Sequence, residues 1–301
     1  MENCGVAHDF TLRKLAGIVS LMGLAGVAIA ASPAPVVPDA ELKVKYKISF
    51  IGFDLARANL VSKFDHGLYA TRVGYRTTGI VKAVAINAVG DLAANGALDV
   101  THLIPASFTQ ASKENSKESI VNMAIAGGAI KSVNALPEPS PDPARVPVKD
   151  ENKKNVLDPV SAMIVPIGKS KDGLSGACNR SIPIFDGWTR FDVNLTFKSA
   201  QTVDRAGYKG DSVTCAIRWV PIAGHIPDRK GTKFMAENKD IEVTLAPIGD
   251  TGMAAPLHIG VQTMRGHVDI DALEFTVSKS TPSPAPQPAA PAAPATPNAA
   301  N

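Results

Sequence analysis

Strict alternation of apolar and polar residues is the dominant pattern along the chain. In residues 42–50 every even position is apolar and every odd position is lysine or serine. The same period of two recurs in residues 69–76, 189–197, 213–219, 241–245 and 257–261. It predicts β-strands with one buried and one solvent-facing side. Between Ile270 and Leu273 the phase of the alternation slips, which indicates a β-bulge in the last strand.

Turn and capping residues indicate shorter elements. Gly127-Gly128 separates two strand-like runs and predicts a hairpin. Asp158 can cap a helix that has Pro159 in its first turn and ends before Pro166, so we expect one short helix near residues 158–165. Residues 81–95 are rich in alanine and give a weaker indication of helix, which the glycines at 90 and 96 oppose. The chain is therefore expected to be mostly β and antiparallel, as a barrel, a spiral or a sandwich.

One β domain is expected over residues 41–279, because the pattern shows no internal repeat and no boundary between two cores. Residues 134–155 interrupt the alternation with five prolines and several charges. A stretch of this kind predicts a Pro-rich surface insert, either mobile or functional.

The two ends of the chain differ from the domain. Arg13 and Lys14 precede an apolar run at residues 15–29, and Ala28-Ile29-Ala30 offers small residues for cleavage. This pattern predicts a signal peptide at 1–30. An uncleaved anchor is the alternative, but the run is short for a bilayer about 30 Å thick. The residue directly after the cleavage site is Ala31 and not the cysteine that a lipoprotein needs, so we expect a periplasmic protein that is not a lipoprotein.

Proline and alanine dominate both segments that flank the domain. Residues 31–40 are expected to be a flexible linker, and residues 280–301 a disordered Ala/Pro-rich tail. The tail is interpreted either as a spacer without a specific role or as a docking strand for an envelope protein.

Charge argues against a nucleic-acid partner, and hydropathy argues against a transmembrane span. The 31 Lys and Arg residues against 28 Asp and Glu leave a net charge of +3, too balanced for a nucleic-acid-binding protein. After signal removal no run of 18 apolar residues remains, so no transmembrane span is expected.

Cysteine usage makes a sharper prediction. Without residues 1–30 only Cys178 and Cys215 remain, an even pair in an oxidising compartment, which predicts a disulfide. Closing that loop should stabilise the fold by about 4 kcal/mol on the chain-entropy model. Their spacing is unlike the C-x-x-C of a redox pair, and no second Cys or His lies at zinc-site spacing from either cysteine. No metal site and no cofactor are expected.

Catalytic motifs are not recognisable. Gly168-Lys169-Ser170 resembles the end of a phosphate-binding loop, but Met163 stands where that motif needs glycine. No G-x-S-x-G motif occurs. No two of the histidines have the i, i+4 spacing of a helical zinc motif; they are His66, His102, His225, His258 and His267. No catalytic residue is therefore assigned.

The segment at residues 184–192 is the densest in polar and aromatic groups. Asp186-Gly187 predicts a tight turn, after which Trp188, Arg190 and Asp192 line one face of a strand. This cluster is a candidate for ligand binding. The alternative is a hairpin with a cross-strand ion pair.

A series of short motifs resembles the DUF3108 family of exported bacterial proteins. In chain order they are Asp158-Pro159-x-Ser161, Cys178, Phe185-Asp186-Gly187-x-x-Arg190, Tyr208-x-Gly210, Cys215 and Pro221-Ile222-Ala223-Gly224. The resemblance spans about residues 42–278. It implies a periplasmic or envelope protein built from a single twisted antiparallel sheet that curls into an open barrel or spiral.

The hypothesis that combines these points is a non-enzymatic periplasmic protein that supports the cell envelope and binds a lipid or other amphipathic ligand in its curled sheet. One alternative is an envelope hydrolase whose site assembles from distant residues, with Asp186, Arg190, Asp192 and His225 as first suspects. A structural subunit of an envelope assembly is the other.

Overall fold

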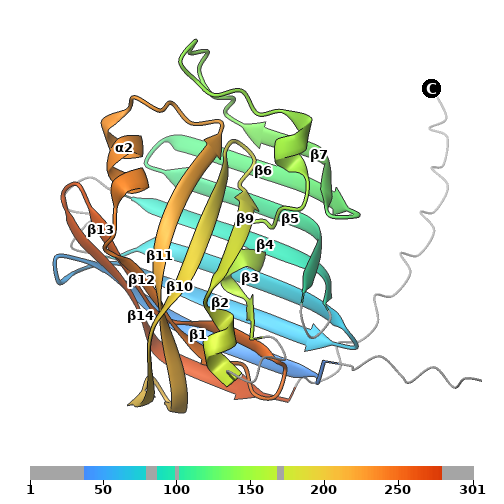
Figure 1. Ribbon diagram of the computed structural model, residues 1–301, viewed down its shortest axis with the longest axis vertical. Helices are drawn as coiled ribbons and strands as arrows, with labels where there is room; N and C mark the ends of the chain where they lie inside the picture. The colour runs from blue at the N-terminus through green and yellow to red at the C-terminus, as the bar shows by residue number, and fades with distance from the viewer. Residues whose placement is uncertain (1–36, 79–86, 99–101, 168–172, 280–301) are drawn as a thin grey trace, which may run out of the picture. The chain divides into compact units, whose positions relative to one another are not determined.

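The computed structural model describes residues 37–78, 87–98, 102–167 and 173–279 (Figure 1). The signal peptide expected at 1–30, most of the linker at 31–40, the Gly168-Lys169-Ser170 motif and the tail at 280–301 lie outside the described residues.

A single sheet of 14 antiparallel strands forms the fold. Its first meander comprises β1 (Ala40–Phe50), β2 (Phe53–Asp65), β3 (Leu68–Thr77), β4 (Ala88–Leu98), β5 (Leu103–Glu114), β6 (Lys117–Ala126) and β7 (Ala129–Leu136). Its second part comprises β8 (Val165–Pro166), β9 (Arg180–Phe185), β10 (Arg190–Arg205), β11 (Tyr208–Ala223), β12 (Ile241–Pro247), β13 (Met253–Thr263) and β14 (Gly266–Ser278). The helical segments are η1 (Asp150–Lys153), η2 (Ser161–Met163), η3 (Gly173–Ala177) and α2 (Lys230–Glu237).

Pairing of the first strand with the last joins the two meanders. The strand order is β7-β6-β5-β4-β3-β2-β1-β14-β13-β12-β11-β10-β9, and β8 pairs with β13 away from this path. The sheet is not closed, because β7 and β9 are its two edges within the described ranges. The fold class expected from the sequence, a curled antiparallel sheet with a short helix, is confirmed.

The chain between the two edges connects them by backbone hydrogen bonds. Asn155 N–H donates over 2.5 Å to the O atom of Gly128, the residue just before β7. Leu157 N–H then donates to Pro183 O of β9 over 2.8 Å, and Phe185 N–H donates back to Leu157 O over 2.9 Å. Residues 155–157 therefore cover the seam between β7 and β9, where an open sheet would otherwise leave edge groups unpaired.

Alternation along the strands explains the core. In β1 the side chains of Leu42, Val44 and Tyr46 are buried, whereas Lys43 and Lys45 are exposed. Three apolar clusters result, one over β1–β3 and β12–β14, a second around Cys178 and Cys215, and a third where the segment after residue 155 packs on β4–β6.

Three local predictions are confirmed. Cys178 and Cys215 form a disulfide with their Cα atoms 5.7 Å apart. Gly127 and Gly128 both take positive φ in the turn between β6 and β7. The register of β1 against β14 shifts between Glu274 and Ala272, so the bulge expected between Ile270 and Leu273 is present and has Leu273 as its extra residue.

Helical segments differ from expectation. The short helix expected near residues 158–165 is a single 3-10 turn, η2, which ends at Met163 because Ile164 is already extended, and Pro166 disfavours helix at the residue before it. The weaker expectation of helix at 81–95 is wrong for residues 88–95, which belong to β4 and pair with β3 and β5. The sequence analysis did not predict α2, whose last carbonyl groups accept hydrogen bonds from the Arg218 guanidinium of β11. No helix in the described ranges is long and apolar enough to span a membrane.

Two glycines test how turn geometry contributes to stability. Gly127 has a φ of +59°, in the left-handed region, whereas Gly231 lies in α2 without a positive φ. A Cβ added at either position would have no other group within 4 Å. We expect Gly127→Ala to lower the free energy of unfolding by about 1 kcal/mol, because left-handed backbone penalises a side chain. Gly231→Ala should raise it by up to about 1 kcal/mol through helix propensity. Urea denaturation of both variants measures the contrast, and equal shifts would contradict it.

Candidate ligand-binding site

A buried polar network fixes the segment that follows the seam. Asp158 and Ser161 are fully buried, and Asp158 Oδ1 accepts the N–H groups of Val160 and Ser161 over 3.0 and 2.8 Å. Ser161 Oγ donates to Asp158 Oδ2 over 2.5 Å and accepts from the Tyr69 hydroxyl over 2.7 Å. Burial raises the pKa of both Asp158 and Tyr69. Asp158 thus caps the turn that leads into η2, whose own N-cap position is Val160, and Ser161 joins the segment to Tyr69 of β3.

Beside this network lies a cavity of about 620 Å³, here called the seam cavity. Its wall comes from the start of β5, the β6–β7 turn, residues 155–157, the chain between η2 and β8, and the start of β9. Most of the lining is apolar and comprises Leu103, Ile104, Pro105, Val156, Leu157, Ile164, Pro166, Ile182 and Pro183. The volume falls within the range of about 300–1,000 Å³ that is typical of small-molecule sites.

Arg180 is the cationic group of the seam cavity. Its Nη2 donates to Gly176 O over 2.6 Å, whereas its buried Nε has no hydrogen-bond partner. No carboxylate forms an ion pair with it among the described residues, and burial lowers its pKa. A half-buried guanidinium without a counter-charge favours an anionic ligand, because a carboxylate or phosphate would restore the interactions lost with water. The sequence analysis did not select Arg180.

The cluster predicted from the sequence lies at the β9–β10 turn. Arg190 Nη1 and Asp192 Oδ1 are 2.7 Å apart in a mostly buried ion pair, although neither atom has hydrogen-bond geometry. The pair joins two positions of β10 and does not cross between strands. Trp188 lies in the turn, where its indole N–H donates to Pro137 O over 3.1 Å. Arg190 and Asp192 come together, whereas Trp188 contacts the residue after β7, and none of the three lines the seam cavity.

The groups suspected of catalysis have structural contacts. Asp186 Oδ1 accepts the N–H groups of Trp188 and Thr189, and its Oδ2 accepts the Thr189 hydroxyl. These three bonds make Asp186 the cap of the tight turn. The backbone oxygen of His225 accepts Val146 N–H over 2.9 Å, and its buried Nδ1 has no hydrogen-bond partner.

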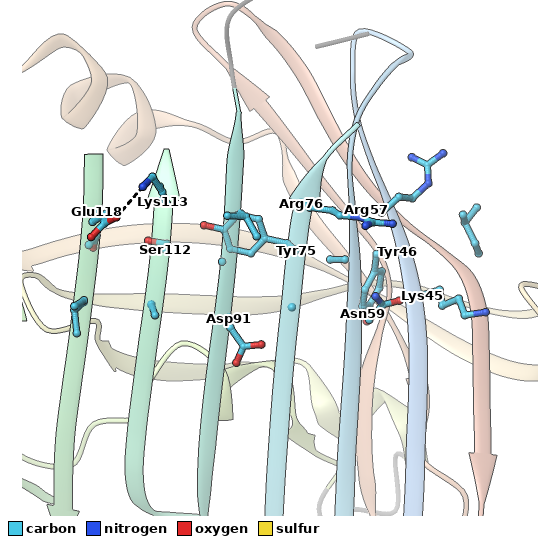
Figure 2. A pocket seen from close by; sticks show the side chains of 18 residues that line it. Lys45, Tyr46, Arg57, Asn59, Tyr75, Arg76, Asp91, Ser112, Lys113 and Glu118 are labelled. Atoms are coloured by element: carbon cyan, nitrogen blue, oxygen red, sulfur yellow. Dashed lines mark hydrogen bonds and ion pairs between the residues drawn. The ribbon is translucent and has the colours of Figure 1, made fainter. Parts of the chain in front are cut away.

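A second hollow crosses the sheet on the face that does not carry the core. This outer groove has a volume of about 930 Å³ and runs over β1–β6. Its floor is the backbone of one cross-strand row, and the side chains of the two neighbouring rows form its sides. Figure 2 shows Arg57, Arg76, Lys113 and Glu118 along one side, and Lys45, Asn59 and Asp91 along the other.

Most charges of the outer groove are neutralised locally. Lys45 pairs with Glu274, Arg57 with Asp54, Arg72 with Asp91 and Lys113 with Glu118, at 2.6–2.9 Å. Exposed ion pairs of this kind contribute little to stability and leave little net field. Arg76 is the lining cation without such a partner in the described part of the chain. The outer groove therefore gives less reason to expect a charged ligand than the seam cavity does.

Comparison with known proteins identifies a family and no activity. The family model described as "protein of unknown function (DUF3108)" matches residues 45–272. No curated protein and no solved structure matched the chain.

Proposed function

Because this chain belongs to the DUF3108 family, whose description assigns no activity, we propose a function from the geometry of the seam cavity. The protein is a non-enzymatic binding protein that holds an anionic amphipathic molecule. The apolar part of the ligand occupies the cavity, and its anionic head binds Arg180.

The half-buried Arg180 in an apolar cavity carries this proposal. Burying a cation without a counter-charge costs free energy, and here neither a carboxylate nor a partner for Nε is present among the described residues. An acyl chain would contact the walls formed by Leu157, Ile164 and Ile182. Apolar contact would supply most of the affinity, and the charge-assisted bonds would fix the orientation.

A periplasmic location is part of the same proposal. The apolar run at residues 15–29 and the Ala28-Ile29-Ala30 sequence support export. The Cys178–Cys215 disulfide supports an oxidising compartment. A carrier or scavenger of amphipathic anions would act there in maintenance of the cell envelope.

The ligand is sought first in the protein as cells produce it. Native mass spectrometry of periplasmic protein, followed by organic extraction, should show a bound amphipathic anion. The purified protein is then titrated with a long-chain fatty acid and with the matching fatty alcohol. We expect Arg180→Gln to weaken fatty-acid binding about tenfold, the loss of one charge-assisted contact, and to leave alcohol binding unchanged.

Two further variants separate charge from shape. Ile104 lies at the cavity wall and is 48% exposed, so the Ile104→Asp variant should fold. A carboxylate in the apolar wall should weaken binding of both ligands. Arg72→Gln, on the exposed pair with Asp91, should change neither. Failure of the wild-type protein to bind the acid, or equal affinity in Arg180→Gln, would refute the proposal.

A further inference from the structure

Two neighbouring turns at one end of the sheet expose large apolar side chains. They are the turn between β1 and β2 and the turn between β13 and β14 (Figure 1). Pairing of β1 with β14 brings the turns together, and Ile51 N–H donates to His267 O over 2.9 Å. Ile51 is 57% exposed, Phe53 72% and Met264 56%. These three side chains are here called the apolar tip.

The backbone of the β1–β2 turn is strained at the residue that it exposes. Ile51 has a φ of +48° and Gly52 a φ of +81°, as in a type I′ turn, whose first central position normally holds Asn, Asp or Gly. A β-branched residue is a genuine outlier in this region, because its Cβ crowds the backbone. An isoleucine that is both strained and exposed does not favour folding, which directs attention to a role outside the fold.

A row of cations lies behind the apolar tip. Lys47 of β1, Arg57 of β2 and Arg76 of β3 are cross-strand neighbours. Lys47 is three positions before the end of β1, so the row lies about 10 Å behind the turn. Arg265 is part of the β13–β14 turn itself and is exposed. Arg57 pairs with Asp54 over 2.6 Å, whereas the other three cations form no ion pair among the described residues.

The carboxylates nearest to this row are held by other groups. Asp271 lies opposite Lys47 across the β1–β14 pair, but its Oδ1 is 2.9 Å from Arg205 Nη2. Asp269 Oδ1 is 3.2 Å from His267 Nε2. The groups that this end of the sheet leaves without a counter-charge, within the described residues, are therefore cationic.

Further apolar chain joins the fold at the same end. Thr78 N–H donates to Leu55 O, close to the β1–β2 turn, over 2.8 Å. Residues 79–86 follow Thr78 and lie outside the described ranges. Their sequence contains one charged residue, Lys82, and no other polar side chain. The apolar tip is defined without them, but their composition extends its chemistry.

We propose that the apolar tip inserts into the surface of an anionic phospholipid bilayer. Elements that lie in a membrane interface bury their apolar side chains about 5–10 Å into the boundary between headgroups and acyl chains. At that depth the cationic row, about 10 Å behind the turn, is level with the lipid phosphates. Insertion removes the three side chains from water, and the cations attract the anionic surface.

The seam cavity remains free in this arrangement. It is lined by the start of β5 and by the β6–β7 turn, which lie at the other end of the antiparallel strands. Membrane binding by the apolar tip therefore goes beyond the proposed ligand binding and uses none of its residues.

Co-sedimentation of the purified protein with lipid vesicles tests the proposal. We expect binding to vesicles of equal parts phosphatidylglycerol and phosphatidylethanolamine that weakens as salt is added. Phe53→Ser should weaken this binding at least about tenfold, because most of a phenylalanine no longer leaves water. Arg265→Gln should weaken it about fivefold and leave binding to phosphatidylcholine vesicles unchanged.

Ile51→Asn separates membrane binding from folding. Asparagine tolerates left-handed backbone, so the urea midpoint of this variant should equal or exceed that of the wild type. Its binding to the anionic vesicles should nevertheless be at least about fivefold weaker. Leu68→Ser is the matched control, because Leu68 is 59% exposed at the β2–β3 turn, at the opposite end of the sheet. It should bind the vesicles as the wild type does.

Three results would overturn the proposal. One is a wild-type protein that does not bind the anionic vesicles, and another is an equal loss of binding in Leu68→Ser and Phe53→Ser. The third is a lipid-free dimer, seen by sedimentation velocity, that Phe53→Ser converts to monomer, since a second copy would then cover the apolar tip. Arg180→Gln should leave vesicle binding unchanged, so this proposal and the fatty-acid site fail separately.

Discussion

Replacing Cys178 and Cys215 together with alanine is expected to lower the free energy of unfolding by about 4 kcal/mol. The bond joins residues 37 positions apart. In the unfolded chain it closes a large loop and so lowers the conformational entropy of the unfolded state. Both cysteines are also buried in the second apolar cluster, where η3 and β9 pack on β11 and β12. Loss of the bond therefore frees the unfolded chain, and the alanines leave a small void as well.

Urea denaturation measures this change, and reduced wild-type protein separates its two sources. Reduction removes the bond and keeps both sulfur atoms, so it should account for most of the 4 kcal/mol. The double variant should lie slightly below reduced wild type, because two sulfur atoms are missing from the core. A difference of less than about 1 kcal/mol between oxidised and reduced protein would show that the loop constraint is not a main source of stability.

Asp158→Ala is expected to lower the free energy of unfolding by about 3 kcal/mol. Three donors lose their acceptor, namely the N–H groups of Val160 and Ser161 and the Ser161 hydroxyl. All three are in the core, where an unsatisfied donor costs about 1–3 kcal/mol. The bond between Ser161 and Tyr69 of β3 would remain, because neither of its atoms belongs to Asp158.

Asp158→Asn is the matched variant. An asparagine Oδ1 can still accept both backbone N–H groups, and its Nδ2 can donate to Ser161 Oγ, which then donates to Tyr69. We expect it to cost only about 1 kcal/mol. Equilibrium denaturation of both variants gives the comparison. Equal losses in the alanine and asparagine variants would mean that hydrogen bonding by residue 158 does not hold the segment.

Candidate sites were harder to predict than strands. The polar residues Arg190 and Asp192 stood out in the sequence because they are close together along one strand, and they proved to pair with each other. Arg180 gave no comparable signal, since it was selected because no carboxylate pairs with it among the described residues.

Local patterns by themselves determined the strands of this protein, the turn at Gly127-Gly128, the bulge between Ile270 and Leu273, the cap at Asp158 and the pairing of Cys178 with Cys215. Each depends on neighbours in sequence, or on a choice among very few cysteines, so a period of two and a few turn residues suffice. Tertiary structure alone decided how β1 meets β14, where residues 155–157 cover the seam, and which side chains face the seam cavity. Those outcomes depend on contacts between residues far apart in the chain, whose free energies no local pattern encodes.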